Sequence, residues 1–305
     1  MKGEICSLMF AIVFVPTMVL GWMLVTNALR IRGVRRAYLN MPVEVREQIL
    51  NRIHEAGRDG AGCSVLVATE PGRSPDDIAG SHYGGIPYAE AGDDWPAREA
   101  GMPDPANFMI QVRLDDSFPP PWPGRLVVVF NRHDVDQTVR CYPLPSAETA
   151  RGPRAPQDQQ PQREWTLRCI RIPRQPALDD AAPGEKVRGG LLDYDPVVLL
   201  ESLPELSEQL SPFTRRPADL LAAILAPNHC GYGFELSDIV QLGGEPVWLK
   251  DNLGGLNCDQ CGRSMRFLFQ FGDLNGGRLL GDGGVCYAFG CDEHPDQPRA
   301  IVQMG

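Results

Sequence analysis

The feature that most constrains this fold is an internal repeat with a constant offset of 159 residues, as from Gly84 to Gly243. "GGIP" at 84 recurs as "GGEP" at 243, "FMIQVRLDD" at 108 as "FLFQFGDLN" at 267, and "GRLVVVFNRHD" at 124 as "GGVCYAFGCDE" at 283. Arg140 and Arg299 extend the match at the same offset. Because the motifs keep identical intervals, we predict two copies of one unit packed into a single pseudo-symmetric body.

Both copies show the sequence pattern of a β protein. From residue 61 onwards short apolar runs alternate with turns, and the chain holds 32 glycines and 28 prolines. We therefore predict a mainly β (α+β) body over 61–305, with copy one at about 81–142 and copy two at about 240–301. A Pro-rich loop at 143–163 and a mixed segment at 164–239 join the copies, and an amphipathic helix at 37–60 precedes them.

The N-terminus begins with a long apolar run, Ile5 to Leu29, which contains no charged residue. Its length is sufficient to cross a bilayer, and "RIRGVRR" follows it directly. A cleaved signal peptide fits less well, because the run is too long and no small-residue cleavage site follows. We predict a single transmembrane helix with a basic collar over 1–36. The arginines after the run place the body in the cytoplasm of a cell-membrane protein.

Charge is distributed unevenly along the chain. The net charge is −10, but the first 36 residues are basic, which leaves −14 on the remainder. A body this acidic disfavours nucleic acid as a partner and favours a basic or extended polypeptide segment. Only three lysines accompany many arginines, which is typical of a GC-rich bacterial genome. The odd count of nine cysteines fits a reducing compartment.

Copy two carries a candidate metal site that copy one lacks. Cys258 and Cys261 form C-x2-C, and after 29 intervening residues Cys291 and His294 form C-x2-H. The aligned residues of copy one are Glu99, Met102, Arg132 and Val135. Three thiolates and an imidazole at this spacing suit a tetrahedral zinc ion. Four ligands make a closed set, so we predict one structural zinc per chain.

The other thiols carry weaker predictions. Cys286 lies five residues before Cys291, so a straight strand points the two side chains to opposite faces, and core packing is the better explanation. Cys63, Cys141 and Cys169 are expected as buried thiols. His229 and Cys230 remain open as a nucleophile pair or extra ligands, although adjacent strand residues diverge.

Catalysis is the alternative to binding. A redox role for the C-x2-C pair is disfavoured, because a strand pattern follows where a thioredoxin-like site begins a helix. The chain lacks G-x-S-x-G, H-E-x-x-H, Walker and dinucleotide-binding motifs. The alternative function is therefore a zinc- or thiol-dependent hydrolase, which would use Cys291, His294 or His82 in a groove between the copies.

The motifs "SHYGGIPYAEAGDDWP" and "FMIQVRLDD" resemble the bacterial YwqG-like family. The ending "CDQCGRSMRFLFQFGDL…VCYAFGCDEHPD" is similar to the C-terminal domain of the eukaryotic programmed-cell-death-protein-two and ribosome-maturation group. The resemblance covers about residues 60 to 305 and excludes the N-terminal run. It implies a duplicated β body that binds polypeptides in a chaperone-like way, and it brings no catalytic residues. The matching positions are Gly84, Gly85, Pro87, Trp95, Pro96, Phe108, Gln111, Gly243, Gly244, Pro246, Phe267 and Gln270.

Taken together, these patterns predict a membrane-tethered protein-binding module or scaffold. Two β units leave a groove or an exposed sheet edge between them, which can receive an extended segment. Trp95, Trp122 and Trp248 are either binding anchors or core residues. The candidate binding residues are His82, Gly84, Gly85, Pro87, Trp95, Gln111, Gly243, Gly244, Pro246, Trp248 and Gln270.

Overall fold

The computed structural model describes most of the chain from residue 25 onwards. The described residues are 22, 25–58, 61–71, 78–96, 105–131, 136–151, 165–173, 196–225, 240–250, 256–272, 280 and 284–304. The predicted transmembrane run lies outside them except for residues 22 and 25–29. Among the described helices, none is both long and apolar enough to cross a bilayer.

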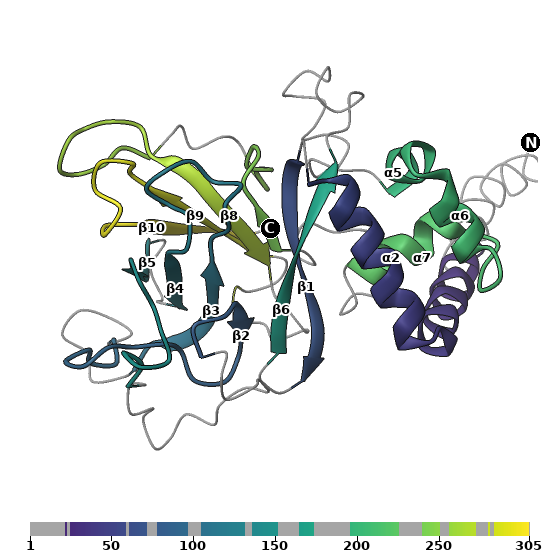
Figure 1. Cartoon of the computed structure of the whole chain (residues 1–305), viewed down its shortest axis with the longest axis horizontal. Helices are drawn as coiled ribbons and strands as arrows, with labels where there is room; N and C mark the ends of the chain where they lie inside the picture. Colours follow the sequence, from purple (N-terminus) through teal and green to yellow (C-terminus); the bar gives the residue numbers. More distant parts are fainter. Residues whose placement is uncertain are drawn as a thin grey trace, which may run out of the picture.

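The two copies form one closed antiparallel barrel, which confirms the prediction of a mainly β fold (Figure 1). Around the barrel the strands run β1-β6-β2-β3-β4-β5-β10-β9-β8-β7. Copy one supplies β2 (His82–Tyr83), β3 (Asn107–Arg113), β4 (Leu126–Asn131) and β5 (Asp136–Tyr142). Copy two supplies β7 (Val240–Leu242), β8 (Arg266–Gly272), β9 (Val285–Gly290) and β10 (Arg299–Gln303).

The strands of the two copies correspond at the offset seen in the sequence. The bounds of β8 and β9 are those of β3 and β4 shifted by 159 residues. Each copy also has the same irregularity, between Phe108 and Ile110 in β3 and between Phe267 and Phe269 in β8. The copies meet where β5 pairs with β10. The sequence repeat is therefore a structural repeat down to the register.

Two more strands, β1 (Ala61–Pro71) and β6 (Trp165–Pro173), close the barrel opposite the β5–β10 junction. Thr166 of β6 faces His82 in copy one, and Val65 of β1 faces the equivalent Gln241 in copy two. Copy one therefore takes its fifth strand from the chain after it, and copy two takes its fifth strand from the chain before copy one. Because the barrel is closed, the expectation of an exposed sheet edge between the copies is wrong.

Apolar side chains fill the barrel interior. They include Trp122, which has no exposed surface, and Phe269, Phe271 and Cys286 from copy two. On the outer faces, Phe108, Val128 and Phe130 of copy one form a cluster that matches Phe267, Tyr287 and Phe289 of copy two. These outer clusters match because strand side chains alternate between the two faces of the barrel.

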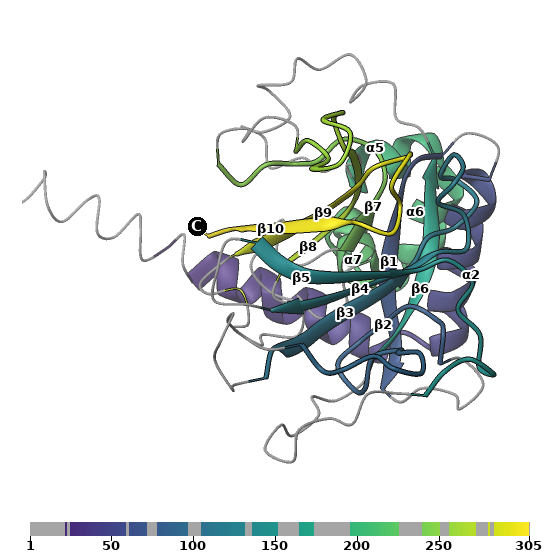
Figure 2. The ribbon, with the colours of Figure 1, turned by 90° about the vertical axis from the view of Figure 1, so that its left-hand side faces the viewer.

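A helical layer covers the outer face of β1 and β6 on one side of the barrel (Figures 1 and 2). Its helices are α2 (Val43–Ala56), α5 (Pro196–Ser202), α6 (Pro204–Leu210) and α7 (Pro217–Leu225). Residues 25–40 are also helical. Ile49 and Ile53 of α2 pack with Ile170 and Ile172 of β6, as the apolar stripe of this helix predicts. Pro204 separates α5 from α6, because proline cannot continue a helix interior.

Candidate metal centre

The first pair of predicted ligands lies in a tight turn just before β8. The backbone N–H of Gly262 donates to the oxygen of Cys258 over 2.8 Å, and the N–H of Cys258 donates to the oxygen of Arg263 over 2.8 Å. Gly262 has a φ of +70°, a conformation that side chains with a Cβ disfavour. The turn therefore bends the chain so that Cys258 and Cys261 lie close together.

The second pair follows β9 directly. Gly290 ends β9 and pairs with Arg266 at the start of β8, so both turns project from the same end of the barrel. The N–H of His294 donates to the oxygen of Cys291 over 3.2 Å, which closes the second turn. Antiparallel pairing thus brings together two ligand pairs that are far apart in the sequence.

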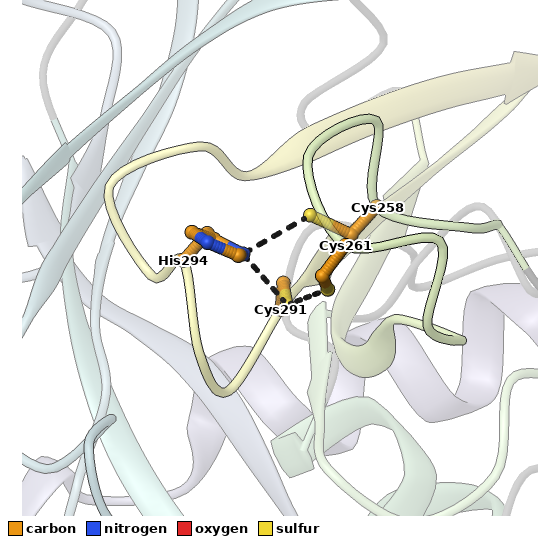
Figure 3. Close-up of side chains that lie close together, drawn as sticks. All are labelled: Cys258, Cys261, Cys291 and His294. Carbon is orange, nitrogen blue, oxygen red and sulfur yellow. Dashed lines mark hydrogen bonds between the residues drawn. The ribbon is translucent and has the colours of Figure 1, made fainter.

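The four ligand atoms form one cluster (Figure 3). They all lie within 4.8 Å of one another. The Sγ of Cys258 is 3.5 Å from the Nδ1 of His294, the Sγ of Cys261 is 3.6 Å from that of Cys291, and the Sγ of Cys291 is 3.7 Å from the Nδ1 of His294. Cys258 and Cys291 are buried, whereas Cys261 and His294 are half-buried. The cluster could hold a metal ion.

Backbone donors favour a thiolate in this cluster. The backbone N–H of Cys261 is the main reason that the pKa of Cys258 is lowered to about 7, and the N–H of Gln260 acts in the same direction. A hydrogen bond to the charged form of an acid stabilises that form. Metals bind the thiolate, so this turn favours metal binding by lowering the pKa of Cys258 as well as by bringing the two cysteines together.

Three side chains that the sequence patterns did not assign to the metal site hold the second turn in place. Asp292, between the ligands Cys291 and His294, accepts two hydrogen bonds from Arg266 over 3.0 and 2.7 Å. Trp122 of copy one donates its Nε1–H to the same carboxylate over 2.6 Å. Together these bonds lower the pKa of Asp292, with Arg266 the larger cause. The position of Asp292 next to Cys291 could have indicated a role in the metal site, but nothing in the sequence linked Trp122 to Asp292.

Ion pairs also connect the turns to their surroundings. Arg263, after the first turn, pairs with Glu293 in the second. Asp259 in the first turn lies 3.4 Å from Arg299 of β10. Asp259, Arg263 and Glu293 are exposed and Arg299 is half-buried, so each pair contributes little to stability. The first pair nevertheless joins the two turns to each other, and the second joins the first turn to β10.

Among the described residues, the other thiols are not part of the cluster. Cys286 is fully buried in the barrel interior, as predicted, and burial raises its pKa. Cys141 and Cys169 are half-buried, and burial raises the pKa of Cys169 to about 12, which makes it a poor nucleophile. His229, Cys230 and the side chain of Cys63 lie outside the described part of the chain.

Most of the predicted binding residues build the turns of the two copies. The Oε1 of Gln111 accepts from the N–H of Tyr88 over 2.7 Å, and the Oε1 of Gln270 accepts from the equivalent N–H of Val247 over 2.8 Å. His82 lies 3.0 Å from the oxygen of Gly84 and is 1% exposed. Gly84 and Pro87 are buried, Gly85 and Pro246 are half-buried, and the φ angles of Gly84, Gly85, Gly243 and Gly244 are all positive.

The predicted tryptophan anchors pack against the outer clusters. Trp95 is half-buried, contacts Phe130 edge-on and donates its Nε1–H to the oxygen of Ala106 over 2.7 Å. Trp248 is 8% exposed and packs against Tyr287 and Phe289. The sequence left these residues as either binding anchors or core residues, and their contacts are those of packed residues.

Two hollows adjoin the metal centre. The larger, of about 450 Å³, lies between Phe118 and Pro119 of copy one and the Gly243–Gly244 turn of copy two, and Arg266 and Asp292 also line it. The smaller, of about 320 Å³, is lined by Cys258, Asp259, Arg299 and Gln137. The larger hollow is therefore a groove that both copies form.

Neither the models of known protein families nor the curated proteins compared with this chain give a match.

Proposed function

We propose that the protein is a membrane-tethered polypeptide-binding module, or scaffold, whose four-residue cluster holds one structural zinc ion. The observation that carries the zinc assignment is the spacing of the ligand atoms. A tetrahedral ion with Zn–S of about 2.3 Å and Zn–N of about 2.0 Å separates its ligands by about 3.5–3.8 Å. Three of the six distances between ligand atoms, 3.5, 3.6 and 3.7 Å, match that range, and all six are within 4.8 Å.

A structural role is favoured over catalysis by the closed ligand set. A catalytic zinc keeps one position open for water or substrate, whereas three thiolates and an imidazole complete a tetrahedron. In the described part of the chain, apolar side chains pack the barrel interior. His82, a residue of the hydrolase alternative, is almost fully buried within its own turn.

Polypeptide binding is supported by the groove between the copies and by charge. The groove adjoins the metal centre, so the two zinc-linked turns would hold its wall in place. Glu245 and Asp292 both line it, although Arg266 neutralises Asp292, and the chain carries a net charge of −10. An acidic surface attracts basic segments over long range.

Membership of the YwqG-like family and attachment to the cell membrane are parts of the same proposal. The Gly-Gly-x-Pro motifs of the resemblance form equivalent turns in both copies, and the glutamine of each Phe-x-x-Gln motif, on β3 or β8, accepts a hydrogen bond from the residue after the proline. The apolar run at 5–29 would anchor the chain with the body in the cytoplasm. A reporter fused after residue 305 and active only outside the cytoplasm would overturn this topology.

The binding proposal is tested with the purified full chain and a labelled arginine-rich extended peptide. We expect saturable binding that weakens as salt rises, and no binding of an acidic peptide of equal length. Glu245→Lys, in the groove, should weaken binding more than Glu208→Lys on α6. The hydrolase alternative expects turnover of a small ester, amide or phosphoester that Cys291→Ser or His294→Ala abolishes while the fold survives. Such turnover without peptide binding would overturn the proposal.

A further inference from the structure

One face of the N-terminal helix, residues 25–40, is left uncovered by the rest of the body. The opposite face packs into the helical layer, where Ala37 and the following Met41 are buried. On the uncovered face the exposed fractions are 72% for Trp22, 56% for Val25 and 61% for Leu29. A spacing of three and four residues places these side chains in one stripe along a helix. Contact of such large apolar side chains with water is unfavourable, so a contiguous stripe of them indicates an interaction surface.

The same face becomes basic towards the body. Residues 25–40 contain four arginines and no acidic residue, and Arg32, Arg35 and Arg36 are exposed. Arg215 and Arg216, before α7, are exposed as well. Asp219 of α7 lies 3.8 Å from Arg30 and 3.7 Å from Arg216, and Arg30 shares the packed side of the helix with buried Ala37. This concentration of arginine contrasts with the net charge of −10 on the whole chain.

We propose that this face, from here on the lipid-facing surface, docks on an anionic bilayer. It consists of Trp22, Val25, Leu29, Arg32, Arg35 and Arg36. The apolar stripe enters the boundary between headgroups and acyl chains, where tryptophan is enriched. The arginines lie one to two helical turns further along and reach the anionic headgroups.

The orientation of the whole body follows from this contact. The helix continues to residue 40 and is tied to the helical layer by Arg30–Asp219 and by the stacking of Arg46 on Tyr38, so no flexible linker separates the lipid-facing surface from the body. The metal centre lies on the far side of the barrel from this helix (Figure 1). The groove and the metal centre would therefore face away from the membrane and remain open to a partner. This inference rests on the membrane part of the proposed function and not on polypeptide binding.

The test uses the full chain in nanodiscs made of phosphatidylcholine alone or mixed with phosphatidylglycerol. Amide hydrogen exchange in peptides covering 25–40 should be slower in the anionic discs, by about fivefold for each arginine engaged. Peptides from the metal centre should exchange equally in both. Arg35→Gln with Arg36→Gln should remove most of the difference. The matched pair Arg113→Gln, at the end of β3, and Arg151→Gln, after β5, changes two exposed arginines elsewhere and should leave it unchanged.

Two results would overturn the inference. Equal exchange in the two kinds of disc would show that anionic lipid does not contact this face. Protection that grows with the number of chains per disc, irrespective of lipid charge, would assign the stripe to a second copy of the chain. Because peptide binding is measured separately on the same protein, failure here leaves that part of the proposed function standing.

Discussion

Trp122 of copy one donates its indole N–H to Asp292 of copy two over 2.6 Å, and Asp292 lies between two of the proposed metal ligands. The indole also packs against the backbone of Gly290, the last residue of β9. A side chain at the core of the barrel thus contacts the turn that holds Cys291 and His294. We infer that metal binding and the packing between the two copies stabilise each other.

Trp122→Phe tests this relationship, because it keeps most of the packing and removes the hydrogen bond. A bond to a charged acceptor contributes about 1.5–3 kcal/mol, so we expect a loss of that size in the free energy of unfolding. We also expect the protein to release zinc faster to a chelator. Trp95→Phe is the control, since it removes the bond to Ala106 in copy one. It should lower stability without changing zinc release, and equal release from both variants would contradict the coupling.

The ligand assignment predicts different outcomes for neighbouring cysteines. Cys258→Ser should lose the metal and lower the free energy of unfolding by about 4 kcal/mol or more, because metal binding contributes to folding. Cys286→Ser should retain about one zinc per chain, measured by elemental analysis, since Cys286 lies inside the barrel. The assignment is wrong if Cys286→Ser releases zinc and His294→Ala does not.

Gly290 has no room for a side chain. A Cβ built there would lie 2.0 Å from the indole of Trp122. Gly290→Ala should therefore destabilise the protein by about 1–3 kcal/mol or more in urea unfolding, because overpacking displaces the ring. Gly33→Ala is the matched control, since nothing lies within 4 Å of its Cβ. It should be neutral or stabilising, because alanine favours a helix.

The sequence predicts the copies and the cluster well, for a physical reason. Turn glycines and strand residues repeat at a fixed offset, and C-x2-C and C-x2-H are local patterns whose geometry depends on a few neighbouring residues. The exchange of β1 and β6 between the copies was not predictable, because neither strand resembles the other in sequence and their pairing is long-range. The same holds for Trp122 and Asp292, which are 170 residues apart.

The last prediction concerns pH and the docking of α2 on the barrel. The Nδ1 of His54 accepts a hydrogen bond from the backbone N–H of Arg171 over 3.2 Å, so that nitrogen must be unprotonated. Burial is the main cause that lowers the pKa of His54 below 6.5, Arg171, Arg168 and Arg58 lower it further, and Asp115 opposes them.

A histidine whose pKa is lower in the folded than in the unfolded state stabilises the fold above the unfolded value, and that contribution is lost as pH falls through 6.5 towards the folded value. His54→Asn should keep an acceptor near the Nδ1 position without a titrating proton. The free energy of unfolding, measured in urea from pH 7.5 to 5, should therefore fall less in the variant than in the wild type. An equal fall in both proteins would show that another group carries the pH dependence, because carboxylates common to both cancel in the comparison.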